Sequence, residues 1–309
     1  MLMKVSVIIP NYNHAQFLED RIESVLKQTY PDIEVLILDD ASTDDSKTII
    51  EKYRSNPKIT KIVYNDTNGG STFKQWQKGF GLAAGDLIWI AESDDWCEHN
   101  FLEVLINGMQ NSPGCILAYA QTYCVDSENN IWWVTKTNKL GEYVEGKTYI
   151  KNYLLKGCSI VNASMAIFKK EALLNIPNDF TDFKFFGDWL FWIETAKQGD
   201  VFISGKILNF FRRNDKAISE KGHATGLNFI ENLKIIAFLK KYGLVSNSLY
   251  KQLIFLRYTV FKKNSKKYSE EIVRQIEKDF MAVFPSTFYA RRYLFTMQLK
   301  SVFKMAGSK

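Results

Sequence analysis

Residues 33–46 read Ile-Glu-Val-Leu-Ile-Leu-Asp-Asp-Ala-Ser-Thr-Asp-Asp-Ser, a mostly apolar run that ends in acids and hydroxyls. Such a run is typical of a strand that helices cover on both faces of a parallel sheet. Residues 42–44 are good caps for a helix that follows. Capping does not explain Asp39, because a carboxylate directly after a buried strand must be hydrated, paired or used. The stretch therefore predicts a buried strand that presents functional acids, Asp39 and Asp40, at its carboxyl end.

Strands and helices alternate through the first half of the chain. Strands are expected at residues 5–10, 33–39, 59–64 and 87–91, and helices at 17–26, 44–53 and 73–84. This alternation predicts right-handed βαβ units and an α/β fold with a mostly parallel central sheet flanked by helices. Further strands are expected at 115–123, 164–168 and 201–211, and a further helix at 188–197. The chain after residue 225 reads as a helical C-terminal appendage, so domains are expected at 1–224 and 225–309.

The composition excludes several classes of protein. The chain has 309 residues, 46% of them hydrophobic and 24% charged, so it can bury a sizeable core and does not read as collagen, coiled coil or disorder. Its four cysteines stand far apart, which argues against a zinc site or a secreted disulfide framework and favours a reducing compartment. No secretory leader is recognised, and no apolar stretch reaches the ~18 to 20 residues of a spanning helix. We therefore expect a protein that is soluble or lies on a membrane surface.

Positive charge is concentrated at the C-terminal end. The whole chain carries +6, but residues 225–309 hold 16 Lys and Arg against five Asp and Glu, or +11, whereas residues 1–224 carry −5. No helix-turn-helix, RNP or zinc-finger motif accompanies this charge, so we expect no nucleic-acid partner. The basic end indicates either peripheral contact with an anionic membrane or an ordinary solvated helix surface.

A second acidic stretch, Glu92-Ser-Asp-Asp95, follows the apolar run at 87–91. Parallel strands bring their carboxyl ends to one edge of a sheet, where α/β proteins bind ligands. Three carboxylates within four residues repel one another, and an oxygen-preferring cation such as Mn²⁺ or Mg²⁺ relieves the repulsion. The stretch therefore predicts a metal site beside Asp39, with a solvated, capped turn as the ordinary alternative.

Six short segments follow one another along the chain, and their order and spacing can be compared with those of known families. They are Pro-Asn-Tyr-Asn at 10–13, Asp-Asp-Ala-Ser-Thr-Asp-Asp-Ser at 39–46, Asn-Gly-Gly at 68–70, Ala-Gly-Asp-Leu-Ile-Trp-Ile-Ala-Glu-Ser-Asp-Asp-Trp at 84–96, Gly-Asp-Trp-Leu-Phe-Trp at 187–192 and Phe-Arg-Arg at 211–213. Together they resemble the nucleotide-sugar domain of the inverting family 2 glycosyltransferases, which have the GT-A fold. The order and spacing fit across about residues 4–215, and the C-terminal part falls outside the resemblance.

The resemblance implies a role for each matching residue. Asp39 would accept the hydrogen bond from N3 of a uracil or a comparable base edge, beside Pro10, Asn11 and Tyr12, which would border the base and ribose. Asp94 would bind the metal that bridges the diphosphate. The donor-binding residues implied in this way are Pro10, Asn11, Tyr12, Asp39, Asp40, Asn68, Glu92, Ser93, Arg212 and Arg213.

The resemblance assigns the catalytic base, and residue chemistry suggests further contacts. Asp188 matches the catalytic acid of the family's Glu-Asp pair and would take the proton of the acceptor hydroxyl. Trp189 could stack on an acceptor sugar, with a plain core residue as the alternative. His223 could add a metal ligand from a loop or be an ordinary surface histidine. Arg212 and Arg213 could reach the diphosphate or form a solvated surface pair.

The chain departs from the family pattern at three places. Glu92 stands where the first Asp of the Asp-x-Asp motif is usual, and Gly187 replaces the usual Glu before Asp188. Gln77-Lys78 replaces a usual Arg-Asn. The Q-x-x-R-W motif and the membrane spans of processive members do not occur in the sequence, which favours the addition of a single sugar.

The resemblance therefore implies a metal-dependent, inverting, non-processive glycosyltransferase. Its donor would be a nucleotide-sugar, expected to be UDP-linked, bound within 1–111, and its acceptor and base region would lie within 112–224. The acceptor would be a hydroxyl of a glycan or lipid-linked glycan in bacterial cell-surface polysaccharide synthesis, at the cytoplasmic face of the membrane. A catalytically silent nucleotide-sugar or glycan-binding module and a nucleotidyltransferase are the alternatives.

Overall fold

The computed structural model describes residues 3–213, 225–284, 288, 290 and 292. Contacts divide the chain into two compact units, Met1–Asp215 and Lys216–Lys309. This division precedes the expected domain boundary after residue 224, and residues 214–224 lie outside the described part of the chain.

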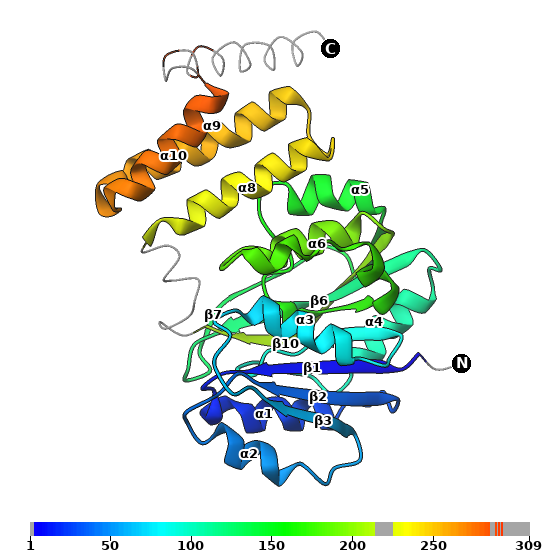
Figure 1. The fold of residues 1–309 in the computed structure, drawn as a ribbon. Helices are drawn as coiled ribbons and strands as arrows, with labels where there is room; N and C mark the ends of the chain where they lie inside the picture. Colours follow the sequence, from blue (N-terminus) through cyan, green and yellow to red (C-terminus); the bar gives the residue numbers. More distant parts are fainter. Residues whose placement is uncertain (1–2, 214–224, 285–287, 289, 291, 293–309) are drawn as a thin grey trace. The chain divides into compact units, whose positions relative to one another are not determined.

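The strands of the first unit form one mixed sheet (Figure 1). They are β1 (Val5–Asn11), β2 (Ile33–Asp39), β3 (Ile59–Tyr64), β4 (Leu87–Ile90), β5 (Trp96–Cys97), β6 (Cys115–Val125), β7 (Ile131–Val134), β8 (Gly141–Val144), β9 (Ala166–Lys169) and β10 (Asp200–Arg212). Over the described residues their order is β3-β2-β1-β4-β9-β6-β10-β5, with β7 added to β6 and β8 to β10.

Helices connect these strands. The first unit contains α1 (Ala15–Leu26), α2 (Ser46–Lys52), α3 (Thr72–Leu82), α4 (Phe101–Gln110), α5 (Gly146–Tyr149) and α6 (Gly187–Ala196). Shorter turns are a π-helix at Ile150–Leu154 and 3₁₀ helices at Ala163–Met165, Lys170–Asn175 and Asn178–Asp182.

Most strands of the sheet run in one direction. β3, β2, β1 and β4 pair in parallel, with Asn11 opposite Asp39 at the ends of β1 and β2. β9 is antiparallel to both β4 and β6, so β6 runs the same way as β4, and β10 pairs in parallel with β6. The carboxyl ends of β1, β2, β4, β6 and β10 therefore share one edge of the sheet. The predicted α/β fold with a mostly parallel central sheet is confirmed.

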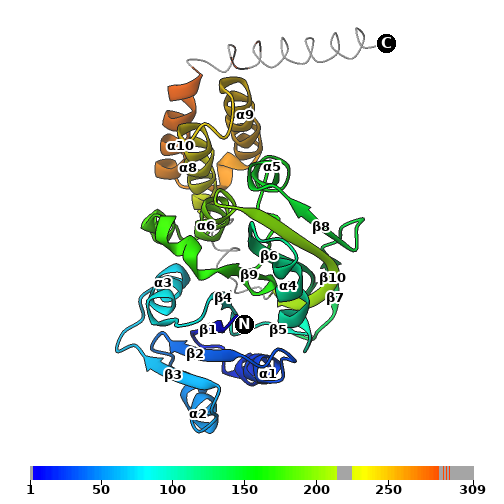
Figure 2. The same cartoon turned by 90° about the vertical axis from the view of Figure 1, so that its right-hand side faces the viewer.

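Helices cover both faces of the sheet (Figure 2). Val5, Val7 and Ile9 of β1 are fully buried in a core cluster with apolar residues of α1 and α4. Ile8 faces the other side, where a Cβ added to Gly79 of α3 would lie 2.6 Å from its Cγ2 atom. Gly79 thus lets α3 approach the sheet closely. Because both faces are covered, β1 and β2 are buried along their whole length, which explains their continuous apolar runs.

The second unit is helical over its described residues. It contains α8 (Leu227–Lys241), α9 (Asn247–Asn264), a 3₁₀ turn at Ser265–Lys267 and α10 (Glu270–Val283). The hydroxyls of Ser246 and Ser269 accept hydrogen bonds from the third backbone N–H beyond them and cap α9 and α10. Among the helices that the structure describes, none is both long and apolar enough to cross a bilayer.

Candidate functional site

The loops after β1 and β2 interlock at the carboxyl edge of the sheet. Asn11 donates from Nδ2 to Asp39 Oδ1 at 2.7 Å, and the Ser42 hydroxyl donates to the same oxygen at 2.6 Å. Ser42 Oγ also accepts from the backbone N–H of Asn13 at 2.9 Å. Asn11 is buried, yet its Oδ1 atom finds no hydrogen-bond partner in the described residues. The edge therefore holds an oriented carboxylate beside a buried amide oxygen without a hydrogen-bond partner in the described residues.

Two residues of these loops have left-handed backbone. Asn13 has a φ of 55° and Ala41 a φ of 59°. For an alanine this conformation costs about 1 to 2 kcal/mol, and it persists where surrounding bonds impose it. Such a bond joins the loops here, because Asn13 Oδ1 accepts from the backbone N–H of Thr43 at 2.8 Å. Strain of this kind is common at binding sites, which agrees with a functional role for this edge.

Asp40 supports a loop. Its Oδ1 atom accepts hydrogen bonds from the side-chain amides of Asn65 and Gln75, each at 2.6 Å, and from the backbone N–H of Gly69 at 3.0 Å. The side chain is buried. These bonds tie the loop 68–70 to the end of β2. These internal bonds make Asp40 a support of the loop, and its role in donor binding stays a prediction.

Replacing Asp40 with alanine is expected to lower the free energy of unfolding by about 1 to 3 kcal/mol, because the buried Gln75 amide would lose its acceptor. Urea unfolding of the protein without ligands measures this change. Asp66→Ala, an exposed acid near the same loop, is the matched control and should shift stability by less than about 0.5 kcal/mol. Equal unfolding midpoints for the two variants would contradict the supporting role.

The turn after β4 concentrates carboxylates. Burial, and after it the charge of Asp94, raises the pKa of Glu92 to about 8, although the indole N–H of Trp76 donates to Glu92 Oε1 at 2.8 Å. Asp95 is fully buried, and burial raises its pKa as well. Repulsion within this turn therefore favours the binding of a proton or a cation.

Glu92 and Asp94 fit a divalent cation. Asp94 is half-buried, and Arg212 donates to its backbone carbonyl oxygen and not to its carboxylate. In the part of the chain that the structure describes, no group of three or more His, Cys, Asp or Glu side chains forms a complete metal site. Two hard oxygen ligands suit a cation that takes its other ligands from phosphate and water, as Mg²⁺ commonly does.

Arg212 is an internal support of this turn. Its guanidinium is 3% exposed and lies 4.1 and 4.6 Å from the ring centroids of Phe17 and Trp96. Nη1 donates to the Asp94 carbonyl oxygen at 2.8 Å. This burial corrects the alternative of a solvated surface residue, and a diphosphate contact by Arg212 stays a prediction. Arg213 is half-buried, and its role in donor binding stays a prediction.

Asp188 lies in the first turn of α6, which begins at Gly187. A Cβ added at Gly187 would lie 2.4 Å from the Phe180 carbonyl oxygen and 2.7 Å from the Phe73 ring of α3. The packing therefore leaves no room for the glutamate that is usual at this position. A glycine here explains why Asp188 stands alone as the acid of its segment.

A short series of contacts joins the start of α6 to the acidic turn. Phe73, against which Gly187 packs, meets Trp76 edge-on at 5.2 Å between ring centroids. Trp76 in turn donates to Glu92. The start of α6, which carries Asp188, is therefore linked through α3 to the edge that carries Glu92.

Trp189 is not part of this surface. Trp189 is 3% exposed, and its indole N–H donates to the Leu154 carbonyl oxygen at 2.8 Å. The expectation that it stacks on an acceptor sugar is corrected, because the ring belongs to the core. His223 lies outside the described residues.

The remaining predicted donor residues divide by exposure. Tyr12 is 44% exposed and Asn68 is exposed, so both can meet a ligand. Pro10 is buried within β1, and the buried Ser93 hydroxyl lies 2.8 Å from His14 Nδ1. The last contact ties the loop after β1 to the acidic turn, and the same loop is bonded to the loop after β2.

Three supporting residues escaped the sequence analysis. Arg21 of α1 is fully buried beside the acidic turn. Its position among the apolar residues of that helix could have indicated a buried cation from the sequence. Ser164 donates its hydroxyl to Asp95 at 2.6 Å, and Trp76 donates to Glu92. Neither of these two carried a signal, because their partners are remote in sequence.

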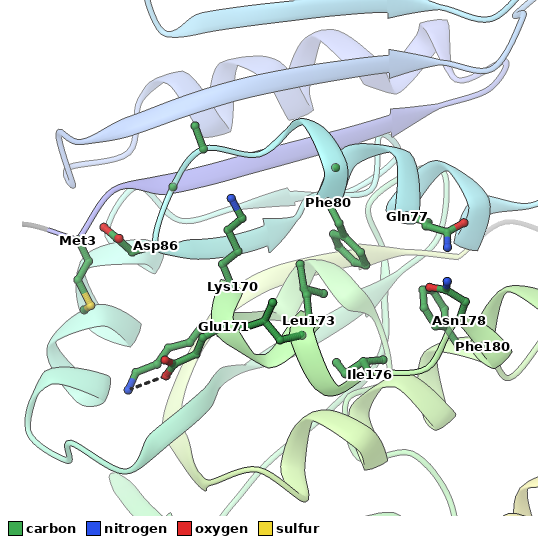
Figure 3. Close-up of a pocket in the computed structure, with 15 residues that line it drawn as sticks. Met3, Gln77, Phe80, Asp86, Lys170, Glu171, Leu173, Ile176, Asn178 and Phe180 are labelled. Carbon is green, nitrogen blue, oxygen red and sulfur yellow. Dashed lines mark ion pairs between the residues drawn. The ribbon is translucent and has the colours of Figure 1, made fainter.

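A pocket of about 830 Å³ lies at the opposite edge of the sheet (Figure 3). Met3 and Asp86 line it beside the starts of β1 and β4. Phe80 of α3 also lines it, together with Lys170 and Leu173 of the 3₁₀ helix Lys170–Asn175. None of the predicted site residues lines this pocket. The acids that can do chemistry lie at the carboxyl ends of the strands, and the candidate site is therefore placed there.

Comparison with known proteins agrees with this geometry. A family model described as "Glycosyl transferase family 2" matches residues 6–176, a range that contains Asn11, Asp39 and the acidic turn 92–95. The chain belongs to glycosyl transferase family 2. The family 2 match ends before Asp188, so that residue's role is not part of it.

Curated relatives match this family 2 chain over parts of their length. Glycosyltransferase GlyG of Streptococcus pneumoniae is 29% identical over 129 residues, 42% of each protein. The poly(ribitol-phosphate) β-N-acetylglucosaminyltransferase TarS of Staphylococcus aureus is 34% identical over 104 residues, 33% of this chain and 18% of TarS. The putative teichuronic acid biosynthesis glycosyltransferase TuaG of Bacillus subtilis is 28% identical over 198 residues, 63% of this chain and 73% of TuaG. The chain thus spans less than half the length of GlyG and TarS.

The fold is also similar to a solved structure. The crystal structure of residues 1–349 of S. aureus TarS in complex with UDP has a TM-score of 0.66 and 19% identity, covering 92% of this chain and 81% of that one. At this identity the likeness concerns the fold alone. It confirms the predicted GT-A type fold of this family 2 chain.

Proposed function

We propose that this chain is a metal-dependent, inverting glycosyltransferase that moves one sugar from a UDP-sugar to a hydroxyl of a glycan or lipid-linked glycan. One observation carries the proposal: the Asn11–Asp39 pair and the Glu92–Asp94 carboxylates lie at the carboxyl ends of neighbouring parallel strands. A nucleotide base needs directional hydrogen-bond partners, which the first pair offers. A diphosphate needs positive charge, which a cation on the second pair supplies.

The base and ribose would bind beside β1 and β2. The bonds from Asn11 and Ser42 fix the orientation of the Asp39 carboxylate, whose lone pairs can accept a further bond from N3–H of uracil. The exposed Tyr12 ring can contact the nucleoside. A UDP-linked donor is supported by the structures of TarS with UDP and with UDP-GlcNAc.

Glu92 and Asp94 would hold Mn²⁺ or Mg²⁺ with the donor diphosphate. When bound, such a cation stabilises the negative charge that develops on the departing nucleoside diphosphate. One Glu92 oxygen is already fixed by the Trp76 indole N–H, and the other would meet the cation. The longer Glu side chain at this position is thus oriented by α3.

Asp188 would act as the base. The acceptor hydroxyl oxygen forms a bond to the anomeric carbon as the bond from that carbon to the diphosphate breaks. The hydroxyl proton passes to the Asp188 carboxylate, and the nucleoside diphosphate leaves with the electron pair. Attack from the face opposite the leaving group inverts the anomeric carbon, so no covalent intermediate is needed. Its place in the first turn of α6 favours an anionic carboxylate there.

Incubation with a panel of UDP-sugars tests the proposal. We expect UDP release in the presence of Mn²⁺ and its loss in EDTA, and a rise in melting temperature with UDP and Mn²⁺. At about 100 times its dissociation constant a ligand adds ~2.7 kcal/mol of stability, so the rise is measurable. No response to UDP with Mn²⁺ would contradict the proposal. Binding without release from any donor would favour the silent binding module, to which Glu92 and Gly187 at motif positions also point.

We also propose that the enzyme works on cell-surface polysaccharide at the cytoplasmic face of the membrane. The names of TarS, a poly(ribitol-phosphate) glycosyltransferase, and TuaG, a putative teichuronic acid biosynthesis glycosyltransferase, support the first part. Within the second unit, Leu256, Val260 and Lys263 are exposed on α9 at helical spacing, and the exposed Lys267 follows in the 3₁₀ turn Ser265–Lys267. Each well-placed lysine adds about 1 kcal/mol of attraction to an anionic leaflet.

Flotation with liposomes checks the membrane contact. Binding is expected to vesicles that contain phosphatidylglycerol, to weaken as salt rises, and to be absent with phosphatidylcholine alone. The charge-reversed variant Lys263→Glu/Lys267→Glu should float less than Lys61→Glu/Lys74→Glu, which reverses two exposed lysines of the first unit. Equal flotation of the two variants, or flotation that salt leaves unchanged, would contradict this contact.

A further inference from the structure

Two buried arginines meet the acidic turn from distant parts of the chain. Arg21 on α1 is 0% exposed, and Arg212 at the end of β10 is 3% exposed. Arg21 Nε donates to the backbone carbonyl oxygen of Glu92 at 2.9 Å, and Arg212 Nη1 donates to that of Asp94 at 2.8 Å. The carbonyls on both sides of Ser93 are therefore each held by a cation.

Asp95 and Ser164 complete this hold. Asp95 Oδ1 accepts from the backbone N–H of Arg212 at 2.9 Å. The Ser164 hydroxyl donates to Asp95 Oδ2 at 2.6 Å and accepts from the backbone N–H of Glu92 at 3.0 Å. Arg21 Nη2 lies 3.8 Å from Asp95 Oδ2, close enough for attraction but too far for a hydrogen bond. Asp95 is thus engaged internally, and the backbone of the turn is fixed at both ends.

Arg21 is not explained by core packing, because a buried and incompletely paired arginine lowers the stability of the fold. Its Nη1 and Nη2 atoms lack hydrogen-bond partners in the described residues, and its guanidinium lies 5.6 Å from the Trp89 ring centroid. A buried charge without full pairing lowers stability, and an apolar residue of similar size often packs as well or better. What this side chain adds is a positive charge beside the acids and one bond to the Glu92 carbonyl.

We infer that Arg21 is a positioning residue for the cation and diphosphate site, an inference that rests on the proposed function. By holding the Glu92 carbonyl it fixes the turn so that the Glu92 and Asp94 carboxylates are presented together at the edge of the sheet. Its charge offsets part of the repulsion within the turn. Arg212 does the same for the Asp94 end, and neither arginine needs to touch the ligand.

The test compares Arg21→Gln and Arg21→Lys with Gln28→Met. Gln28 is buried, as Arg21 is, and lies just after the end of α1. Its side-chain amide donates to the carbonyl oxygens of Ser24 and Glu98 at 3.0 and 2.8 Å. Its loss therefore removes buried hydrogen bonds without touching the acidic turn. For each variant we would measure the melting temperature in EDTA, the half-saturating Mn²⁺ concentration for UDP binding, and kcat and KM for the donor.

Arg21→Gln is expected to raise the half-saturating Mn²⁺ concentration and the donor KM by about 10- to 100-fold, the range for loss of an outer partner of a metal ligand. Gln28→Met should lower the melting temperature but leave both constants unchanged. Arg21→Lys keeps the charge without the planar guanidinium and should fall between Arg21→Gln and the parent.

Two outcomes separate failure of the inference from failure of the proposed function. Parent-like constants in Arg21→Lys, or in a folded Arg21→Gln, would overturn the positioning role, and Arg21→Lys decides the matter if Arg21→Gln does not fold. A parent protein that fails to bind UDP with Mn²⁺ would instead contradict the proposed function.

Discussion

Replacing Asp188 with asparagine is expected to lower kcat for sugar transfer by about 10²- to 10⁴-fold, because the acceptor hydroxyl would lose its proton acceptor. Asparagine keeps the size of the side chain at the start of α6, so the fold and the donor site should persist. The donor KM and the rise in melting temperature with UDP and Mn²⁺ are therefore expected to stay close to those of the parent. Initial rates measured at saturating donor isolate this loss.

Asp182→Asn is the matched control for this experiment. Asp182 is an exposed acid on the 3₁₀ helix just before α6, and its replacement removes the same charge from the same region. It should leave kcat unchanged. Turnover by Asp188→Asn at the rate of the parent would show that another group takes the proton, and membership of family 2 would stand regardless.

Replacing Asp94 with asparagine is expected to abolish the response to Mn²⁺ and to lower transfer by about 10²-fold or more. A bound cation supplies several kcal/mol of stabilisation to the departing diphosphate, and each ~1.4 kcal/mol is a factor of ten in rate. Unlike Asp188→Asn, this variant should also lose most of the thermal shift with UDP and Mn²⁺. The two variants therefore separate the donor side from the acceptor side.

Glu98→Gln provides the control for Asp94. Glu98 is exposed four residues further along the chain, so it tests a general loss of negative charge near the turn. It should retain the response to Mn²⁺. If Asp94→Asn bound UDP with the same Mn²⁺ requirement as the parent, the assignment of Asp94 as a metal ligand would be wrong.

The sheet could be predicted because burial on both faces leaves a direct trace in the sequence. The strands expected at 33–39 and 59–64 agree with β2 and β3, and the expected 201–211 lies within β10. β7 and β8 were not expected. β7 reads Ile-Trp-Trp-Val, a short apolar run that is mostly exposed, and β8 reads Gly-Glu-Tyr-Val and has no such run. β5 has two residues, too few for any periodic pattern.

The candidate site could be predicted where a residue's place in the chain determines its place in space. Asp39 ends a buried strand, so its position at the carboxyl edge follows from the strand itself. The roles of Asp40 and Arg212 depended on partners that only folding brings together, namely Gln75 for the first and Phe17 for the second. The motif showed which charges were present but could not show which of them were buried.

The tight packing around Gly187 limits how this enzyme can be redesigned. A second acid at that position could not be installed by one substitution, because even a methyl group there would overlap the Phe180 carbonyl and the Phe73 ring. The segment around Phe180 and the start of α3 would have to be rebuilt at the same time. The packing of Phe73 and Phe180 therefore keeps a single acid at this segment. A variant library that aims at two acids should vary positions 73, 180 and 187 together.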